Sequence, residues 1–444
     1  MFARFKQIFS PQNKDLRKRI LFTFFVLFIF KLGTTIVVPG LDKDALGTNE
    51  LGFMQLLNVM GGGALEQFSI FALGVMPYIN ASIIVSLLQM DIIPYFSELS
   101  QQGESGRAKL NQITRYMGIA LAFIQGYIYS LTFIKNGSPL DYLSYSVILT
   151  AGTCLVIWMG DQISEKGIGN GISLIIMTGI IASLPTMFTS LWSELVITTS
   201  TQAMCFGIVK FLLFVLLYVA ILLGVVFIEV SERRIPIQYA NKSTSVYGKQ
   251  QSYIPFKLNS TGVMPVIFAS MIMAIPSIIG AVSKNSSVQI FINKWLVTNS
   301  VPGFIIYMVC IFVFSYFYTF VQLKPAQMAE NLNKNGGFIP GIRPGKDTEE
   351  YIKKVLKRIT MIGALSLAVI AGLPIVFGAV SNLATNISIG GTGLLIVVGV
   401  ALETYKQLDG ELLTRSYTKK GRRKWIILYC WLLQLLERGH NLNY

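Results

Sequence analysis

The heptapeptides GVMPYIN, at Gly74–Asn80, and GVMPVIF, at Gly262–Phe268, share their first four residues and an isoleucine at the sixth position. Each opens an apolar run close to the ~20 residues that an α-helix needs to cross a bilayer. The repeat predicts that the chain is built from two corresponding halves. Chance similarity between two helices rich in valine, methionine and glycine is the alternative interpretation.

Apolar runs of this kind dominate the chain. Hydrophobic residues make up 53% of it and charged residues only 13%, which indicates a polytopic membrane protein. We do not find the short alternating segments of a transmembrane β-barrel. Ten runs can be read as membrane spans: 20–38, 73–91, 115–134, 142–160, 170–189, 207–229, 262–282, 302–323, 359–380 and 389–407.

Ten spans divide into five and five, and an odd number per half inserts the second half upside down relative to the first. The two GVMP copies then fall on spans 2 and 7, which are equivalent helices of an inverted repeat. We therefore expect an all-α polytopic membrane protein whose ten transmembrane helices form two inverted five-helix halves, 1–189 and 207–413. A loop at 190–206 on the outer side would join the halves.

The net charge of +15 is distributed unevenly among the connecting segments. Most lysines and arginines fall in every second one and in the two terminal segments, which predicts that both termini are cytoplasmic. The basic charge indicates topology and attraction to anionic lipids and acidic cytosolic partners, and not sequence-specific binding of nucleic acid. The single histidine, His440, excludes a zinc site or a histidine-based triad, and we expect no cofactor.

Three cytoplasmic segments stand out. The loops 231–260 and 324–357 carry much of the positive charge, and GFIPGIRPGKDT at Gly337–Thr348 surrounds one arginine with glycine and proline. Such loops suggest a docking surface, and solvated loops that only anchor the topology are the alternative. The basic tail 414–444 contains a short apolar stretch that could lie in the membrane interface.

A short apolar segment at about 51–66 lies on the outer side, between spans 1 and 2. It contains Leu56, Leu57 and Met60 and is followed by a joint of three glycines, Gly61, Gly62 and Gly63. A segment tethered in this way could fold back into the helix bundle and occlude it. An ordinary re-entrant or interfacial segment would look the same.

Branched aliphatic residues recur on the central spans. Val75 and Ile79 are four residues apart and share a helix face, as do Ile172 and Ile176. Helix packing is the default interpretation of such residues. No acidic residue lies at the middle of a span, where ion-coupled transporters usually need one, and this weakens the hypothesis of a small-solute secondary transporter.

The chain resembles the SecY family, the channel subunit of the bacterial Sec protein-conducting translocon, over residues 22–413. Eight motifs carry the resemblance in order: GGALEQFSIFALGVMPYINASIIVSLLQ, GESGR, GIGNGISLII, ERRIPIQYA, NSTGVMPVIFAS, PAQMAENL, GFIPGIRPGKDTEEY and GGTGLLIVVGVALET. The resemblance implies a clamshell around a central pore in the bacterial cytoplasmic membrane. This pore would pass unfolded secretory polypeptides outward and release transmembrane segments sideways, without enzymatic activity.

The resemblance also implies roles for individual residues. A ring at the pore's waist would consist of Val75, Ile79, Ile172, Ile176, Ile267 and Ile396. The segment with Leu56, Leu57 and Met60 would be a plug, hinged at Gly61, Gly62 and Gly63. A lateral gate would include Asn80, Ile83, Met271 and Ile275. Docking of the SecA ATPase or the ribosome would use Arg233, Arg234, Arg343 and Lys346.

The implied partners are SecE-like and SecG-like membrane subunits, SecA, the ribosome, signal peptides and preproteins. Two features depart from the family pattern. Asn80 stands where a smaller residue, often serine, is expected, and its amide could bond across the gate or to a neighbouring helix. The tail 421–444 has no counterpart that we recognise. A small-solute transporter and a membrane scaffold that only docks ribosomes are the competing functions.

Overall fold

The structure is a computed structural model. It describes residues 14–39, 61–65, 67–89, 93–134, 138–196, 201–239, 252–260, 262–282, 286–297, 300–381 and 393–412. The predicted plug residues Leu56, Leu57 and Met60 and the tail beyond residue 412 therefore lie outside the described residues.

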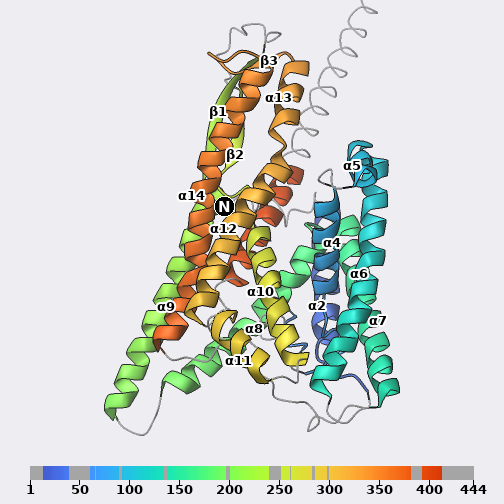
Figure 1. The fold of residues 1–444 in the computed structure, drawn as a ribbon, viewed down its shortest axis with the longest axis vertical. Coiled ribbons are helices and arrows are strands. Elements are labelled where there is room, and N and C mark those ends of the chain that lie inside the picture. Colours follow the sequence, from blue (N-terminus) through green and yellow to red (C-terminus); the bar gives the residue numbers. More distant parts are fainter. Residues whose placement is uncertain are drawn as a thin grey trace, which may run out of the picture.

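Helices make up most of the described chain (Figure 1). In chain order they are α2 (Lys14–Gly33), α4 (Met76–Leu88), α5 (Pro94–Gln101), α6 (Glu104–Phe133), α7 (Pro139–Lys166), α8 (Gly171–Leu195), α9 (Thr201–Val230), α10 (Met264–Val282), α11 (Ser286–Trp295), α12 (Val301–Leu323), α13 (Pro325–Lys334), α14 (Lys346–Ser381) and a last helix over 393–412. Each of the ten predicted spans overlaps one of these helices.

Five helices of the described chain are long and apolar enough to cross a membrane. They cover Pro139–Lys166, Gly171–Leu195, Met204–Val230, Val301–Lys334 and Lys346–Val376. The apolar segments Met76–Leu88 and Met264–Met273 are shorter. A membrane crossing by all ten helices stays a prediction.

Several helices begin where a side chain caps the first turn. At the start of α7, Ser138 and Asp141 form a reciprocal capping box. The Asn170 side chain accepts a hydrogen bond from the Ser173 amide at the start of α8, and Ser300 does the same for Gly303 at the start of α12. The polar residues between the apolar runs thus fix these helix boundaries.

The α4 helix is shorter than the predicted span 73–91, because its N-terminal repeat residues lie in a turn. Gly74 has a φ of 53°, which favours glycine, and Pro77 lies in the first helical turn. The first span also ends early, at Gly33. A Cβ on Gly33 would lie 2.0 Å from Phe71 Cε2, so only glycine lets this aromatic ring pack against the end of α2.

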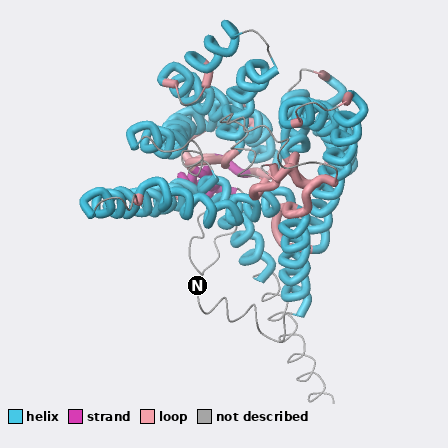
Figure 2. The backbone as a smooth tube through the Cα atoms, turned by 90° about the horizontal axis from the view of Figure 1, so that it is seen from below, coloured by secondary structure: helices cyan, strands magenta, loops and turns pink. Residues whose placement is uncertain are grey.

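Two large apolar cores organise the helices. The first joins α2, α4, α6, α7 and α8, and the second joins α9, α10, α12, α14 and the helix over 393–412. In Figure 1, α4, α6 and α7 lie on one side and α9, α12 and α14 on the other, and the view from below in Figure 2 shows loop segments between the helices. The first core also contains Phe268, Ile396 and Val400, and the division into halves at 1–189 and 207–413 stays a prediction.

Two helices belong to both cores. Helix α10 contributes Val266 and Met273 to the second core and Phe268 to the first. The helix over 393–412 contributes Leu395 to the second core and Ile396 to the first. Opposite faces of these two helices thus connect the two cores, and α8 also packs against α9 through Leu191, Leu195 and Phe214.

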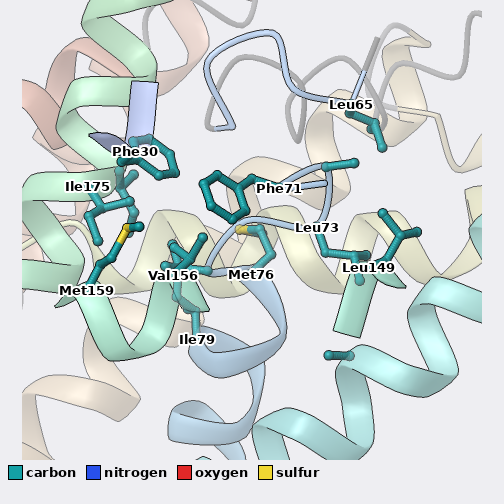
Figure 3. Packing of buried hydrophobic residues seen from close by; sticks show 14 of the residues in the cluster. Phe30, Leu65, Phe71, Leu73, Met76, Ile79, Leu149, Val156, Met159 and Ile175 are labelled. Carbon is teal, nitrogen blue, oxygen red and sulfur yellow. The ribbon is translucent and has the colours of Figure 1, made fainter. Parts of the chain in front are cut away.

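The first core reaches into the turn before α4 (Figure 3). Phe30 and Phe71 stack with ring centroids 6.0 Å apart and an interplanar angle of 9°. The backbone amide of Val38 donates to the Phe68 carbonyl at 3.1 Å, and the Ile70 amide donates to the Ile36 carbonyl at 3.0 Å. These contacts hold the described residues that follow the glycine joint against α2.

A three-stranded sheet makes the all-α prediction incomplete. Strands β1 (Glu232–Tyr239), β2 (Ser252–Lys257) and β3 (Gly337–Phe338) pair in the order β2-β1-β3, both pairs antiparallel. The pairing of Gln238 with Phe338 joins the two large loops that the sequence predicted separately. Ile235, Phe256, Leu332, Ile352 and Leu356 form a buried core beneath the sheet, together with α13 and α14. The sequence pattern missed this sheet because β3 has only two residues and pairs with a strand far away in the chain.

Candidate functional site: an apolar ring at one end of a polar cavity

The six predicted ring residues lie in one apolar cluster. They come from four elements: the start of α4, α8, α10 and the helix over 393–412. Exposure is 4% for Val75, 7% for Ile79, 6% for Ile176 and 6% for Ile396. Ile172 and Ile267 are partly buried and pack against the same cluster. The structure therefore brings all six together, although they are spread over more than 300 positions of the sequence.

Five of the six line a cavity of about 900 Å³: Ile79, Ile172, Ile176, Ile267 and Ile396. Val75 is not among the lining residues and sits one helical turn before Ile79, at the cap of α4. Figure 3 shows Ile79 on the first turns of α4, near Val156 and Met159 of α7. The isoleucines thus form one surface of a large internal space.

Most of the other residues that line the cavity are polar, and the remainder include Val263, Met264, Val400 and Leu402. Several polar residues lie to one side of the isoleucines along the chain. Asn170 precedes Ile172 and Ile176, Asn259 precedes Ile267, and Glu403 follows Ile396. The last helix runs antiparallel to α8, because Gly169 lies beside Thr404 and Gly393 beside Ile180. Asn170 and Glu403 therefore lie toward the same end of the cavity.

Two acidic residues that line the cavity, Asp161 and Glu229, have polar partners. Arg115 Nη2 and Asp161 Oδ2 are 2.9 Å apart and connect α6 to α7. Glu229 is 8% exposed and accepts a hydrogen bond of 2.7 Å from the Asn259 side-chain amide. Such pairing keeps the wall polar and wettable without leaving a strong charge of one sign.

The glycine joint at Gly61, Gly62 and Gly63 packs against two helices. Gly62 and Gly63 have φ angles of 70° and 87°, in the region that favours glycine. The Lys31 ammonium donates a hydrogen bond of 2.9 Å to the Gly62 carbonyl. A Cβ on Gly62 would lie 3.1 Å from the backbone of Gly179 in α8. The joint is thus held at the base of the predicted plug.

The predicted gate residues differ in their surroundings. Ile83 is buried and shares the first core with the partly buried Met271, whereas Ile275 is 55% exposed. Asn80 is half-buried, and its Oδ1 atom is buried without a hydrogen-bond partner among the described residues. The structure thus places Ile83 and Met271 in one cluster and leaves Ile275 outside it.

The four predicted docking residues are exposed at the end of the molecule that carries the sheet (Figure 1). Arg233 and Arg234 lie on β1, and Arg343 and Lys346 lie at the start of α14, just after β3. A hydrogen bond of 2.8 Å to Glu232 raises the pKa of Arg234, whose guanidinium also lies 4.8 Å from the centre of the Tyr253 ring. The pairing of β1 with β3 thereby brings together the two loops that carry these basic residues.

The sequence patterns did not predict the buried pair of Glu229 and Asn259. A carboxylate that ends a long apolar run has to find a hydrogen-bond donor when it is buried. Asn259 stands three residues before the second GVMP copy, and this was the signal that could have suggested the pair.

Comparison with known proteins gives a consistent result. The SecY family model matches residues 69–405. The protein translocase subunit SecY of Halalkalibacterium halodurans is 44% identical over 431 residues, covering 94% of this chain and 99% of the relative.

Solved structures share the fold at low sequence identity. A structure described as a protein conducting channel aligns with a TM-score of 0.63 at 19% identity, covering 90% of this chain and 93% of the other. Sec61 in a canine ribosome-channel complex from the endoplasmic reticulum aligns with a TM-score of 0.63 at 18% identity, with the same coverage.

Proposed function

The chain belongs to the SecY family, and we propose that it forms a protein-conducting channel that moves unfolded secretory polypeptides across a membrane and releases transmembrane segments laterally into it. One observation carries the proposal. Six aliphatic side chains from four helices gather in one apolar cluster, and five of them line a cavity of about 900 Å³.

The ring suits a channel for many different polypeptides. Aliphatic side chains offer no fixed hydrogen bonds, so the ring can deform around any sequence and still resist ion flow by dewetting. The polar end of the cavity would receive the chain in a hydrated state. A polypeptide that passes from the polar wall to the apolar ring then needs no chemical recognition of its individual residues. We propose that the protein catalyses no reaction itself.

The proposed architecture is a clamshell of ten transmembrane helices in two inverted halves, 1–189 and 207–413. The two apolar cores support this division. Residues 190–206 would be the hinge, and the seam between α4 and α10 would be the lateral gate, with Asn80, Ile83, Met271 and Ile275 along it. The segment about 51–66 would be the plug, hinged at the glycines that contact Lys31 and Gly179.

The proposed partners follow from the exposed basic residues and the apolar helix faces of the molecule. The SecA ATPase or the ribosome would dock on Arg233, Arg234, Arg343 and Lys346, because all four are exposed. SecE-like and SecG-like subunits would cover apolar helix faces within the bacterial cytoplasmic membrane, with both termini of the chain cytoplasmic. Basic cytoplasmic segments would attract anionic lipids.

Reconstitution tests the function. The purified chain, with a SecE-like subunit and SecA in lipid vesicles, should make a signal-bearing preprotein resistant to external protease when ATP is present. A matched preprotein with a charged residue in the apolar part of its signal should stay sensitive. Accumulation of a small solute without any protection of preprotein would instead support the transporter, which the translocase relatives do not favour.

A further inference from the structure

A buried pair of polar side chains connects the end of α9 to the turn that opens α10. Glu229 and Asn259 are 8% and 3% exposed. The Asn259 Nδ2 atom donates to Glu229 Oε1 at 2.7 Å and to the Gly262 carbonyl at 3.0 Å. One amide group therefore contacts both the preceding helix and the first residues of the second GVMP copy.

The segment that carries Asn259 is fixed on the side of the second core. The Leu258 amide donates to the Ser231 carbonyl at 2.9 Å. The Leu258 carbonyl approaches α14 so closely that a Cβ on Gly363 would lie 2.4 Å from it. Leu258 and Asn259 are thus held by α9 and α14, before the chain turns into α10.

A further contact is needed to fix the backbone conformation of the turn at Gly262. Gly262 has a φ of 61°, and nothing lies within 4 Å of the position a Cβ would take there. Its conformation is therefore not imposed by packing around that position. The hydrogen bond from Asn259 to the Gly262 carbonyl is the contact that orients this flexible residue, and α10 begins two residues later.

The direction of α10 matters because its faces belong to different cores. Val266 and Met273 pack in the second core, and Phe268 packs in the first, with Ile267 and Met271 against it. A rotation of α10 at the Gly262 turn would move Ile267 and Met271 relative to the first core, to which Ile79 and Ile83 of α4 belong. The start of α10 is thus the point where a small change of angle alters the contact between the halves.

We propose that Asn259, held by Glu229, is a positioning residue that sets the angle of α10 and so stabilises the closed seam between α4 and α10. The inference rests on the proposed function, in which this seam is the gate. Glu229 acts only through Asn259. The charged groups that act on Glu229 are Lys257, Lys406 and Glu403, which also line the cavity, so a chain inside the cavity would lie beside the pair.

The test measures the seam directly, without preprotein. Cysteines are placed at Ile83 and Met271 in a chain that lacks its four natural cysteines, and a short thiol crosslinker reports how often α4 and α10 are close. Asn259→Asp sets a second carboxylate against Glu229, and we expect the ratio of closed to open seam to fall about tenfold, which corresponds to ~1.4 kcal/mol. Asn331→Asp adds the same charge on the exposed face of α13 and should crosslink like the parent.

A double variant in which donor and acceptor are exchanged distinguishes a positioning role of Asn259 from general destabilisation of the protein. Glu229→Gln alone keeps an oxygen acceptor and should change the yield less than Asn259→Asp does. Combined with Asn259→Asp, it restores an amide-to-carboxylate hydrogen bond with donor and acceptor exchanged. The double variant should regain only the part of the crosslinking that was lost to repulsion between two carboxylates, because the carboxylate introduced by Asn259→Asp cannot donate a hydrogen bond to the Gly262 carbonyl. Parental crosslinking in the double variant or in Asn259→Asp would overturn the proposal.

Asn259→Ser covers the case in which the aspartate variant does not accumulate in the membrane. Serine is too short to bridge Glu229 and Gly262, adds no charge, and should lower the yield in the same direction. Parental crosslinking in Asn259→Ser then contradicts the proposal. Preprotein transport by the parent chain is measured separately, so a failure of the proposed function is visible even when the crosslinking results agree with the positioning role.

Discussion

At the scale of single residues, the ring depends on being uniformly apolar. Ile396 is 6% exposed and lies in the cluster with Ile79 and Ile176. Ile396→Asn would place an amide there with no partner, and water or ions would then enter the apolar end more easily. We expect higher ion conductance and export of preproteins with defective signals.

Ile396→Val is the matched control, because it keeps the surface apolar and removes one methylene group. Planar-bilayer conductance and export of a signal-defective preprotein are measured for both variants. Equal conductance and equal signal stringency in Ile396→Asn and Ile396→Val would remove Ile396 from the ring.

Asn80 raises the free energy of the arrangement seen in the structure. Its buried Oδ1 atom lacks a hydrogen-bond partner among the described residues, and such an atom costs about 1–3 kcal/mol. A serine in a helix can satisfy its hydroxyl on its own backbone, as Ser86 does on the Ser82 carbonyl. Asn80→Ser should therefore favour the closed seam and reduce export of preproteins with weak signals.

The measurement compares export of one preprotein carrying a strong or a weak signal. Asn80→Asp serves as the opposite change, because a buried carboxylate should disfavour closure further. If both substitutions leave the preference for strong signals unaltered, Asn80 only packs between helices.

At the scale of elements, the helices were easier to predict than their junctions. Long apolar runs locate membrane helices because lipid leaves few alternatives, and all ten predicted ranges overlap helices. The sheet was missed, since its strands carry arginine and proline and pair over a long distance in the chain. The short α4 was also missed, because the backbone of Gly74 decides where that helix starts.

The ring illustrates a different limit of the sequence. Helical spacing places Val75 with Ile79 and Ile172 with Ile176, but it cannot bring four separate elements together. Periodicity alone favoured helix packing, and only the family resemblance selected these six residues. The partner of Glu229 was missed for a related reason. Asn259 lies 30 residues further along the chain, and the contact depends on how the residues between them fold.

Reversing the charge of one predicted docking residue, such as Arg343, should impair docking of SecA as a whole. Arg343 is exposed, and its carbonyl accepts a hydrogen bond from Thr348 at 2.8 Å, which fixes the loop before α14. Arg343→Glu changes the charge while the backbone contact remains. We expect SecA-driven export to fall at least about tenfold through charge repulsion, with the protein still inserted in the membrane.

Lys354→Glu is the matched control, since Lys354 is an exposed residue further along α14 with no predicted docking role. SecA binding and preprotein transport are measured together. Normal export in Arg343→Glu, or an equal loss in Lys354→Glu, would contradict a specific role of Arg343 in docking.

At the scale of the whole molecule, a chain in transit should contact the ring and not the outer helix faces. Photoreactive residues at Ile79 and Ile267 should crosslink to a preprotein arrested during transport. Leu216, which is 71% exposed on α9, should not. A scaffold that only docks ribosomes would give no crosslinks at Ile79 or Ile267.

The pairing of β1 with β3 also has a consequence for synthesis of the molecule. When β1 leaves the ribosome, β2 follows after a short interval, but Gly337 and Phe338 of β3 are made only after α10, α11 and α12. One edge of β1 therefore waits unpaired while several apolar helices enter the membrane. Completion of the sheet is therefore a late step of biogenesis, because both residues of β3 must be made before they can pair with β1.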